Sequence, residues 1–281
     1  MKNLKIFFLF AAVILTAIFA VAFAVLPLPG QIPVLMYHFI DTRAQAAESK
    51  NYVSVQSFNR QMDFLKRFGY HVISVKELDE IRAGRRASRG REIVITFDDG
   101  HESFKRNALA VLENYRHPVM LFLISESVKR GLNGSMQIED IKELLRHDWI
   151  SIGSHSRTHP FLSQMTEEQI KDELEGSKKD LEEMTGAPID YFAYPLGDMD
   201  ARVERAAELA GYHMAFTTAY KRLRGLREGP YALTRQKITK SSDNPIVFWV
   251  KISGLYQFFK DGRYKLKTAK GREQAAASQP A

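Results

Sequence analysis

The feature that most restricts the fold of this chain is a regular alternation of short apolar runs with segments of helical spacing. Short apolar strands that alternate with helices are typical of a parallel sheet with crossover helices. Seven or eight such units over about 220 residues favour a closed or nearly closed barrel, so we expect an α/β fold, a distorted (β/α)7–8 barrel. The strands are predicted at 32–40, 71–75, 92–97, 118–124, 149–155, 189–195, 214–218 and 231–239.

The longest predicted helix, at 166–186, carries its own start and stop signals. Thr166 and Gln169 have the spacing of a capping box, and Gly186 is a typical C-terminal stop. The polar residues 41–52 are expected to form a loop. Shorter helices are predicted at 57–70, 76–84, 104–116, 138–148 and 201–211.

Polar residues directly follow several of these strands. Asp98 and Asp99 come after "VITF", His155 comes after "ISIGS", and "YPLG" comes after "DYFA". In α/β barrels the reacting groups lie at the C-terminal ends of the strands. Two adjacent carboxylates repel each other, so their place at the end of a buried strand requires a partner that neutralises or uses them.

His155 and His159, in "SHSRTHP", are four residues apart, and one helical turn or a tight loop can point both imidazoles at one spot. Two histidines and a carboxylate form a common site for a divalent metal, although chance or capping also explains the pair. A bound cation would offset the repulsion between Asp98 and Asp99, because one aspartate could bind the cation and the other could act as a base for water. The absence of cysteine excludes disulfides and thiolate ligands.

Two of these motifs resemble a known family. "TFDDG" and "SHSRTH" are similar to the first two motifs of the polysaccharide deacetylases, carbohydrate esterase family 4, and the resemblance covers roughly residues 32 to 240. It implies a distorted (β/α) barrel and hydrolysis of acetyl groups on a polysaccharide. It also implies that Asp98 is the general base, while Asp99, His155 and His159 hold a divalent metal, usually Zn²⁺.

The third family motif, Arg-x-Pro-Tyr-Gly, is present in altered form as "AYPLG" at 193–197. Leu196 replaces the Tyr, whose backbone N–H holds the oxyanion in the family, and a backbone donor survives a change of side chain. Ala193 replaces the Arg that orients the catalytic Asp. We expect Arg235, in "ALTRQKI", to substitute for it; a surface Arg or an unrelated ion-pair partner is the alternative.

The last family motif, Leu-x-His, supplies the general acid, but "ALTRQ" has Arg where the His would be. The stretch "VLMYHFI" near the N-terminus is similar to the subgroup that deacetylates poly-N-acetylglucosamine, in which the motif order is permuted. The resemblance therefore implies that His38 is the general acid. A hydrogen-bonded core histidine is the alternative.

Residues 1–30 predict a signal anchor or transmembrane helix. Lys2 and Lys5 precede an uncharged run of about 20 apolar residues, which is long enough to span a bilayer. The lysines place the N-terminus in the cytoplasm, so the domain that follows is expected outside it, in the cell envelope or periplasm. "AFA" at 22–24 also fits a cleavage site, which would make the protein secreted.

The remaining chain is predicted to consist of the barrel at 31–240 and a C-terminal segment at 241–281. This segment begins with aromatic and basic residues, which either pack under the barrel or lie on the membrane surface. Its end, "TAKGREQAAASQPA", is expected to be disordered.

The net charge of +7 comes without a nucleic-acid-binding signature, so we expect no nucleic acid partner. An anionic membrane, an envelope polymer or a merely solvated surface explains the charge. The expected function is metal-dependent removal of N-acetyl groups from a polysaccharide that contains N-acetylglucosamine. A hydrolase of O-acetyl esters or of other non-peptide C–N bonds, and a membrane-tethered glycan-binding protein without turnover, are the alternatives. No protein partner is identifiable.

Overall fold

The computed structural model describes the chain apart from residues 1–5, 9, 18–31, 43–50, 219–228 and 254–281. Residues 32–249 form one compact unit. The second unit groups residues 1–31 with 250–281, and only its residues 6–8, 10–17 and 250–253 are described.

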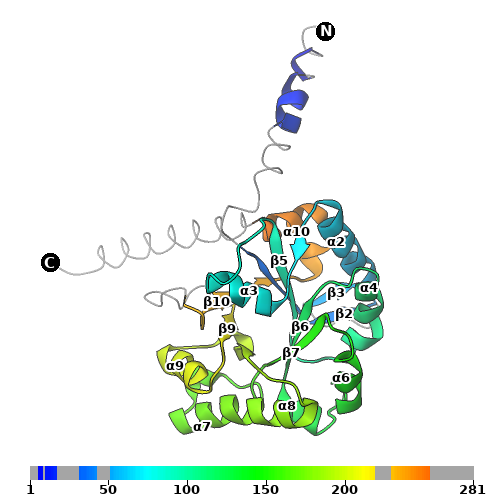
Figure 1. Cartoon of the computed structure of the whole chain (residues 1–281). Coiled ribbons are helices and arrows are strands. Elements are labelled where there is room, and N and C mark those ends of the chain that lie inside the picture. Colours follow the sequence, from blue (N-terminus) through cyan, green and yellow to red (C-terminus); the bar gives the residue numbers. More distant parts are fainter. Residues whose placement is uncertain (1–5, 9, 18–31, 43–50, 219–228, 254–281) are drawn as a thin grey trace, which may run out of the picture. The chain divides into compact units, whose positions relative to one another are not determined.

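The larger unit is built around a nine-stranded sheet (Figure 1). Its strand order is β10-β9-β8-β7-β6-β5-β1-β11, with β4 paired beside β5, and every pair is parallel. The strands are β1 (Val34–Tyr37), β4 (His71–Val72), β5 (Glu92–Phe97), β6 (Val119–Leu123), β7 (Ile150–Ser154), β8 (Tyr191–Ala193), β9 (Met214–Thr217), β10 (Leu233–Thr234) and β11 (Gln236–Lys237).

The two edges of this sheet are joined by a single residue. β10 pairs with β9, β11 pairs with β1, and only Arg235 separates β10 from β11. Backbone bonds continue the ladder on both sides, from Arg235 N to Thr217 O at 3.0 Å and from Ile238 N to Met36 O at 2.9 Å. The sheet is therefore a nearly closed parallel barrel, as the alternation predicted, and the strand expected at 231–239 is two short strands.

The crossover helices lie largely where the spacing predicted them. The capping box of Thr166 and Gln169 is present, and Gly186 ends the last turn in the left-handed conformation with φ 69°. The helices are α2 (Val55–Arg67), α3 (Val75–Arg82), α4 (Leu109–Glu113), α5 (Ser125–Lys129), α6 (Ile138–Leu144), α7 (Glu167–Lys171), α8 (Ser177–Thr185), α9 (Ala201–Leu209) and α10 (Pro245–Ile252), with π turns at Phe104–Ala108 and Asp172–Gly176 and 3₁₀ turns at Leu162–Gln164, Pro195–Gly197 and Lys240–Asp243.

Two strand predictions were wrong in their extent. The strand expected at 32–40 breaks at His38, and its second part, β2 (Phe39–Asp41), pairs with β3 (Tyr52–Ser54). The loop expected at 41–52 therefore begins and ends in strand residues, Asp41 and Tyr52. The strand expected at 71–75 ends after Val72. Ser74 caps α3 there, because its side chain accepts from Glu77 N at 3.1 Å while Glu77 accepts from Ser74 N at 2.7 Å.

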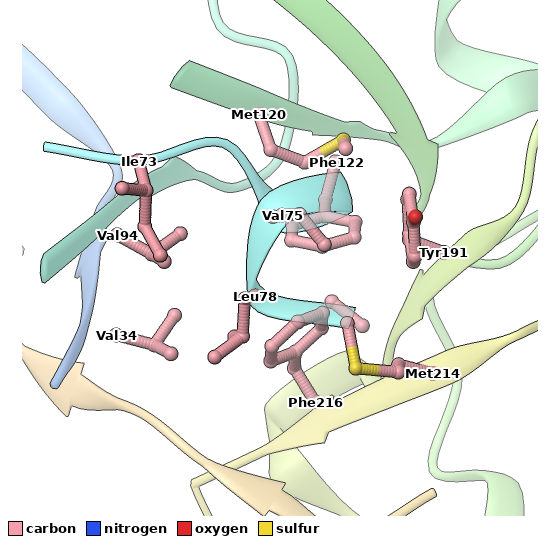
Figure 2. Packing of buried hydrophobic residues seen from close by; sticks show 11 residues of the cluster. Val34, Ile73, Val75, Leu78, Val94, Met120, Phe122, Tyr191, Met214 and Phe216 are labelled. Carbon is pink, nitrogen blue, oxygen red and sulfur yellow. The ribbon is translucent and has the colours of Figure 1, made fainter. Parts of the chain in front are cut away.

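The barrel interior is filled by side chains that alternate along their strands (Figure 2). Met120 and Phe122 on β6, and Met214 and Phe216 on β9, point to the same face because side chains two residues apart share a face. Val75 and Leu78 of α3 complete this cluster. The packed interior fixes the strands, and so it fixes the polar residues that follow their C-terminal ends.

The predicted membrane segment and C-terminal tail lie partly outside the described residues. Residues 6–8 and 10–17 are helical, whereas 1–5, 9 and 18–30 are not described. Among the described residues there is no helix with the length and apolarity needed to cross a bilayer. Of the segment 241–281, residues 254–281 also lie outside the description.

Candidate active site

Asp98 and Asp99 leave the end of β5 in opposite environments. Asp98 is buried, whereas the Asp99 side chain is 27% exposed. Asp99 has a φ of 69°, in the left-handed region that a non-glycine residue adopts at a cost of roughly 1–3 kcal/mol. Gly100 follows at φ 67°, and a Cβ there would come within 2.7 Å of the Leu123 side chain, so glycine avoids both the backbone strain and this close contact. The turn places both carboxylates beside His155 Nε2, which lies 3.8 Å from Asp98 Oδ2 and 3.6 Å from Asp99 Oδ1.

Asp99, His155 and His159 converge on one point. Asp99 Oδ1 lies 3.6 Å from His155 Nε2 and 3.6 Å from His159 Nε2. One ligand atom of each residue lies within 4.8 Å of the others. Two imidazole nitrogens and one carboxylate oxygen at these separations fit a divalent cation with positions left open for water or substrate.

The chemistry of the donors agrees with this fit. His155 Nδ1 lies 2.7 Å from the carbonyl oxygen of Ala193, which can only accept, so Nδ1 carries the proton and Nε2 presents a lone pair. Burial lowers the pKa of both His155 and His159, which keeps the imidazoles neutral as metal binding requires. Burial also raises the pKa of Asp99, and the charge of Asp98 adds to this effect, so an added cation would stabilise the ionised site.

The loop between the two histidines is held by a buried carboxylate. Glu173 accepts from the backbone N–H groups of Arg157 and Thr158, both at 2.9 Å. Ser156 and His159 have φ values of 65° and 64°, and Ser156 Oγ accepts from His159 N at 3.0 Å. These bonds hold a strained loop in the one shape that brings His159 back toward His155.

Asp98 forms a buried ion pair with Arg235. Arg235 Nη1 donates to Asp98 Oδ1 at 2.6 Å and Nη2 donates to Oδ2 at 2.7 Å, while Nη1 also reaches Thr96 Oγ1 at 3.1 Å. Burial by itself raises the pKa of Asp98, but the charges of Arg235, His155 and His38 lower it to about 2. The carboxylate is therefore ionised at neutral pH. Arg235 thus contacts the aspartate that we expected it to orient.

His38 also faces this site. Its pKa is lowered to about 4, chiefly by burial, and the charges that act on it include those of Asp98, Arg235 and His159. Its Nδ1 is buried, and no hydrogen-bond partner for it is present among the described residues. The alternative that His38 is a hydrogen-bonded core histidine therefore lacks its bond at Nδ1.

Leu196 lies in the tight turn after β8. It has a φ of 57°, and its side chain is exposed. The turn is braced by Gly197, whose N–H donates to Tyr194 O and whose carbonyl accepts from Thr217 Oγ1, both at 2.9 Å. Asp198 accepts from Ser163 N at 2.8 Å and from its hydroxyl at 2.9 Å, which ties this turn to the segment after His159.

Sequence reasoning missed several of these supporting groups. The Ala193 carbonyl has no sequence signal, because every residue carries one. Glu173 does have a signal, since it is a carboxylate on the apolar stripe that Ile170 and Leu174 form on the same helical run. Asp198 was expected only as part of a loop, and its bonds to Ser163 depend on a contact 35 positions away.

Hydrolases that activate water commonly combine a metal site with a separate base. The triad that fits a divalent cation and the ionised Asp98 beside it match this arrangement. Comparison with known proteins makes this class more specific. The polysaccharide deacetylase family model matches residues 85–215, which include the two aspartates and the two histidines but neither His38 nor Arg235. The "Putative polysaccharide deacetylase YxkH" of Bacillus subtilis (strain 168) is 30% identical over 211 residues, which are 75% of this chain and 72% of that protein. The chain belongs to the polysaccharide deacetylase family and is a hydrolase of this kind.

Two further relatives extend the comparison. The peptidoglycan-N-acetylglucosamine deacetylase of Bacillus cereus is 30% identical over 121 residues, and the match spans 43% of this chain and 53% of that protein. The structure of IcaB from Ammonifex degensii superimposes with a TM-score of 0.67 at 27% identity, covering 78% of this chain and 97% of that one. The fold is therefore that of the family.

Proposed function

We propose that this protein removes N-acetyl groups from a cell-envelope or exported polysaccharide that contains N-acetylglucosamine, and that it uses a divalent metal, Zn²⁺, to do so. The observation that carries the proposal is the convergence of Asp99, His155 and His159 beside an Asp98 that Arg235 keeps ionised. The name of the Bacillus cereus relative, which acts on peptidoglycan N-acetylglucosamine, supports the choice of sugar.

Asp99, His155 and His159 would hold the metal, which when bound supplies a positive charge that polarises the acetyl carbonyl and makes nearby water more acidic. Asp98 removes a proton from the attacking water, and the water oxygen bonds to the acetyl carbon. Arg235 keeps Asp98 oriented through two hydrogen bonds while this proton moves. The backbone N–H of Leu196 donates to the developing oxyanion.

The C–N bond then breaks, and the leaving nitrogen takes up a proton to become a free amine, while acetate departs. We assign the donation of this proton to His38. Its pKa of about 4 in the free protein means that it is neutral at pH 7, so it must gain its proton during the reaction. The proton that Asp98 has taken from water supplies it, and this transfer restores the negative charge of Asp98, which favours protonated His38. Acid–base help of this kind contributes roughly 10²–10⁴-fold to the rate.

An assay of acetate release from N-acetylglucosamine oligomers tests the proposed function. We expect activity in the zinc-loaded protein, its loss on treatment with a chelator, and its return on addition of Zn²⁺. Asp98→Asn should lower the rate at least about 10²-fold without changing metal content. Oligomer binding with no acetate release by the metal-loaded protein would instead support the glycan-binding alternative.

The role of His38 as general acid can be tested separately. The leaving group of an activated ester departs without being protonated, so its hydrolysis needs no general acid. We expect His38→Gln to lose most de-N-acetylation but to retain hydrolysis of 4-nitrophenyl acetate, whose nitrophenolate departs as an anion. An equal loss on both substrates would show that His38 supports the site in another way. Full activity on both would remove it from the mechanism.

We also propose, from the N-terminal sequence, that the first 30 residues tether the enzyme to the membrane with the barrel outside the cytoplasm. Fractionation of cells that express the full chain tests this proposal. Recovery in the membrane fraction, with the barrel sensitive to protease added outside the cytoplasmic membrane, is expected. Recovery of a shortened protein free of membrane would indicate cleavage after the "AFA" sequence.

A further inference from the structure

A cavity lies at the end of the barrel opposite the active site. It has a volume of about 790 Å³ and is lined by residues that precede or begin β6, β7 and β8, together with residues of α3. Trp149 immediately precedes β7 and His155 immediately follows it, so at about 3.3 Å per residue they lie roughly 20 Å apart. The cavity is thus separate from the metal-binding triad. Its volume lies within the range of about 300–1,000 Å³ that small-ligand sites occupy.

The walls of the cavity offer aromatic rings with polar ends that have no partner. Tyr191 is 7% exposed and Trp149 is 9% exposed, and both line the cavity. Among the described residues, neither the Tyr191 hydroxyl nor the Trp149 indole N–H makes a hydrogen bond. Neither atom is among the buried polar atoms that lack a partner, so both are open to the cavity and available to bond to a molecule held there.

The cavity is acidic although the protein is basic. Five carboxylates and three Lys or Arg side chains line it, a formal charge of −2 before His213 is considered, in a chain of net charge +7. Asp79 is paired with Arg85 at 3.5 Å, whereas Asp148 and Asp190 make no ion pair within the described part of the chain. Burial raises the pKa of Tyr191, and the charges of Asp79, Asp190 and Glu80 raise it further.

We infer that this cavity binds a short stretch of amino sugar, a glucosamine oligomer, as a second and non-catalytic carbohydrate site. Sugar rings pack their apolar faces on aromatic side chains, their hydroxyls bond to groups such as Tyr191, and their ammonium groups pair with free carboxylates such as Asp190. A neutral or anionic glycan lacks the last interaction. The choice of ligand rests on the proposed function, because removal of N-acetyl groups creates this cationic sugar.

The test is calorimetric titration of the full chain with a glucosamine trisaccharide and, in parallel, with the fully N-acetylated trisaccharide. We expect the glucosamine trisaccharide to bind, and the N-acetylated one to bind the cavity at least tenfold more weakly. Tyr191→Phe and Asp190→Asn should each weaken binding of the glucosamine trisaccharide at least fivefold, with acetate release within twofold of the unaltered enzyme. His155→Ala, which removes a ligand of the triad, should leave this binding intact.

Fluorescence locates the bound sugar, because the chain has only two tryptophans. In a Trp249→Phe background, the emission of Trp149 should change on addition of the glucosamine trisaccharide. Asp148→Asn, at an exposed position, serves as a second variant that cannot disturb the core. Binding that is lost in His155→Ala and unchanged in Tyr191→Phe would overturn the inference, as would no binding at all. Absence of acetate release would overturn the proposed function but not this inference, because calorimetry and fluorescence measure binding without any need for turnover.

Discussion

Arg235 and Asp98 are 137 positions apart in the sequence, yet their side chains meet in a two-point ion pair with N–O distances of 2.6 and 2.7 Å. Both side chains are buried, and the guanidinium also lies over the ring of Phe122 at 5.2 Å. Arg235 is the residue that joins the two edges of the sheet. Barrel closure and the orientation of the proposed base therefore depend on the same residue.

Removal of this arginine should damage both stability and catalysis. Arg235→Met leaves the buried Asp98 without its charge partner, and breaking a buried pair in this way costs about 3–5 kcal/mol of unfolding free energy. We expect a loss of this size in urea denaturation at pH 7. We also expect acetate release to fall at least about 10²-fold, because the base loses its orientation and its lowered pKa.

The double variant Asp98→Asn with Arg235→Met separates the two effects. Replacing both charges removes the uncompensated carboxylate, so most of the lost stability should return. Activity should not return, since the base is absent. If stability stays as low as in the single variant, the packing of Arg235 rather than its charge holds the barrel closed.

Glu173 should control metal affinity without contacting the metal. Glu173→Ala removes the acceptor of the Arg157 and Thr158 N–H groups and frees the loop that carries His159. Loss of an outer support of this kind typically lowers metal affinity about 10–100-fold, which a competition titration with a coloured chelator can measure. Glu173→Gln retains an acceptor oxygen and should lose less. Glu175→Ala, on the exposed side of the same helical run, should have no effect.

Leu196 should tolerate glycine although it lies in the site. Its φ of 57° is costly for leucine and free for glycine, and this gain offsets the greater entropy of glycine in the unfolded chain. We expect Leu196→Gly to change unfolding free energy by about 0–1 kcal/mol in the stabilising direction and to keep kcat within twofold, because the backbone N–H remains. Leu209→Gly, at another exposed leucine at the end of α9, should instead cost about 1 kcal/mol. A large fall in kcat for Leu196→Gly would assign the side chain itself a role.

His117 should make the fold sensitive to mild acid. Burial lowers its pKa to about 4, and its buried Nε2 has no hydrogen-bond partner among the described residues. In the unfolded chain the imidazole titrates near 6.5, so between about pH 6.5 and 4 the unfolded state binds more protons. The stability that neutral His117 contributes is therefore fully present above pH 6.5 and is lost as the pH falls toward 4.

His117→Phe keeps the ring that stacks on Tyr115, at a centroid distance of 5.3 Å, and removes the titration. Relative to this variant, the unaltered protein should lose about 1–2 kcal/mol between pH 7 and pH 4, a figure reduced for the partial exposure of the site. Urea denaturation at a series of pH values measures the difference. Parallel stability curves for the two proteins would contradict the assignment to His117.

Several features of the protein follow from sequence because they depend on neighbours in the chain. The alternation of strand and helix periods predicted the barrel, and the capping box at Thr166 and the stop at Gly186 are formed within one helical run. Asp98 and Asp99 are adjacent, and His155 and His159 share one loop, so their approach was readable from two short motifs. The resemblance to a family added roles to these positions.

Only the tertiary structure decided which distant groups contact the two aspartates and the two histidines. The pairing of Arg235 with Asp98, the place of His38 and the support from Glu173 arise where the closed sheet brings strands and loops together. The cavity between Trp149 and Tyr191 has the same origin, because the starts of β7 and β8 and the helix α3 enclose it. Periodicity and capping act over a few residues, whereas these contacts are set by strand register and barrel closure, which no local stretch of the sequence contains.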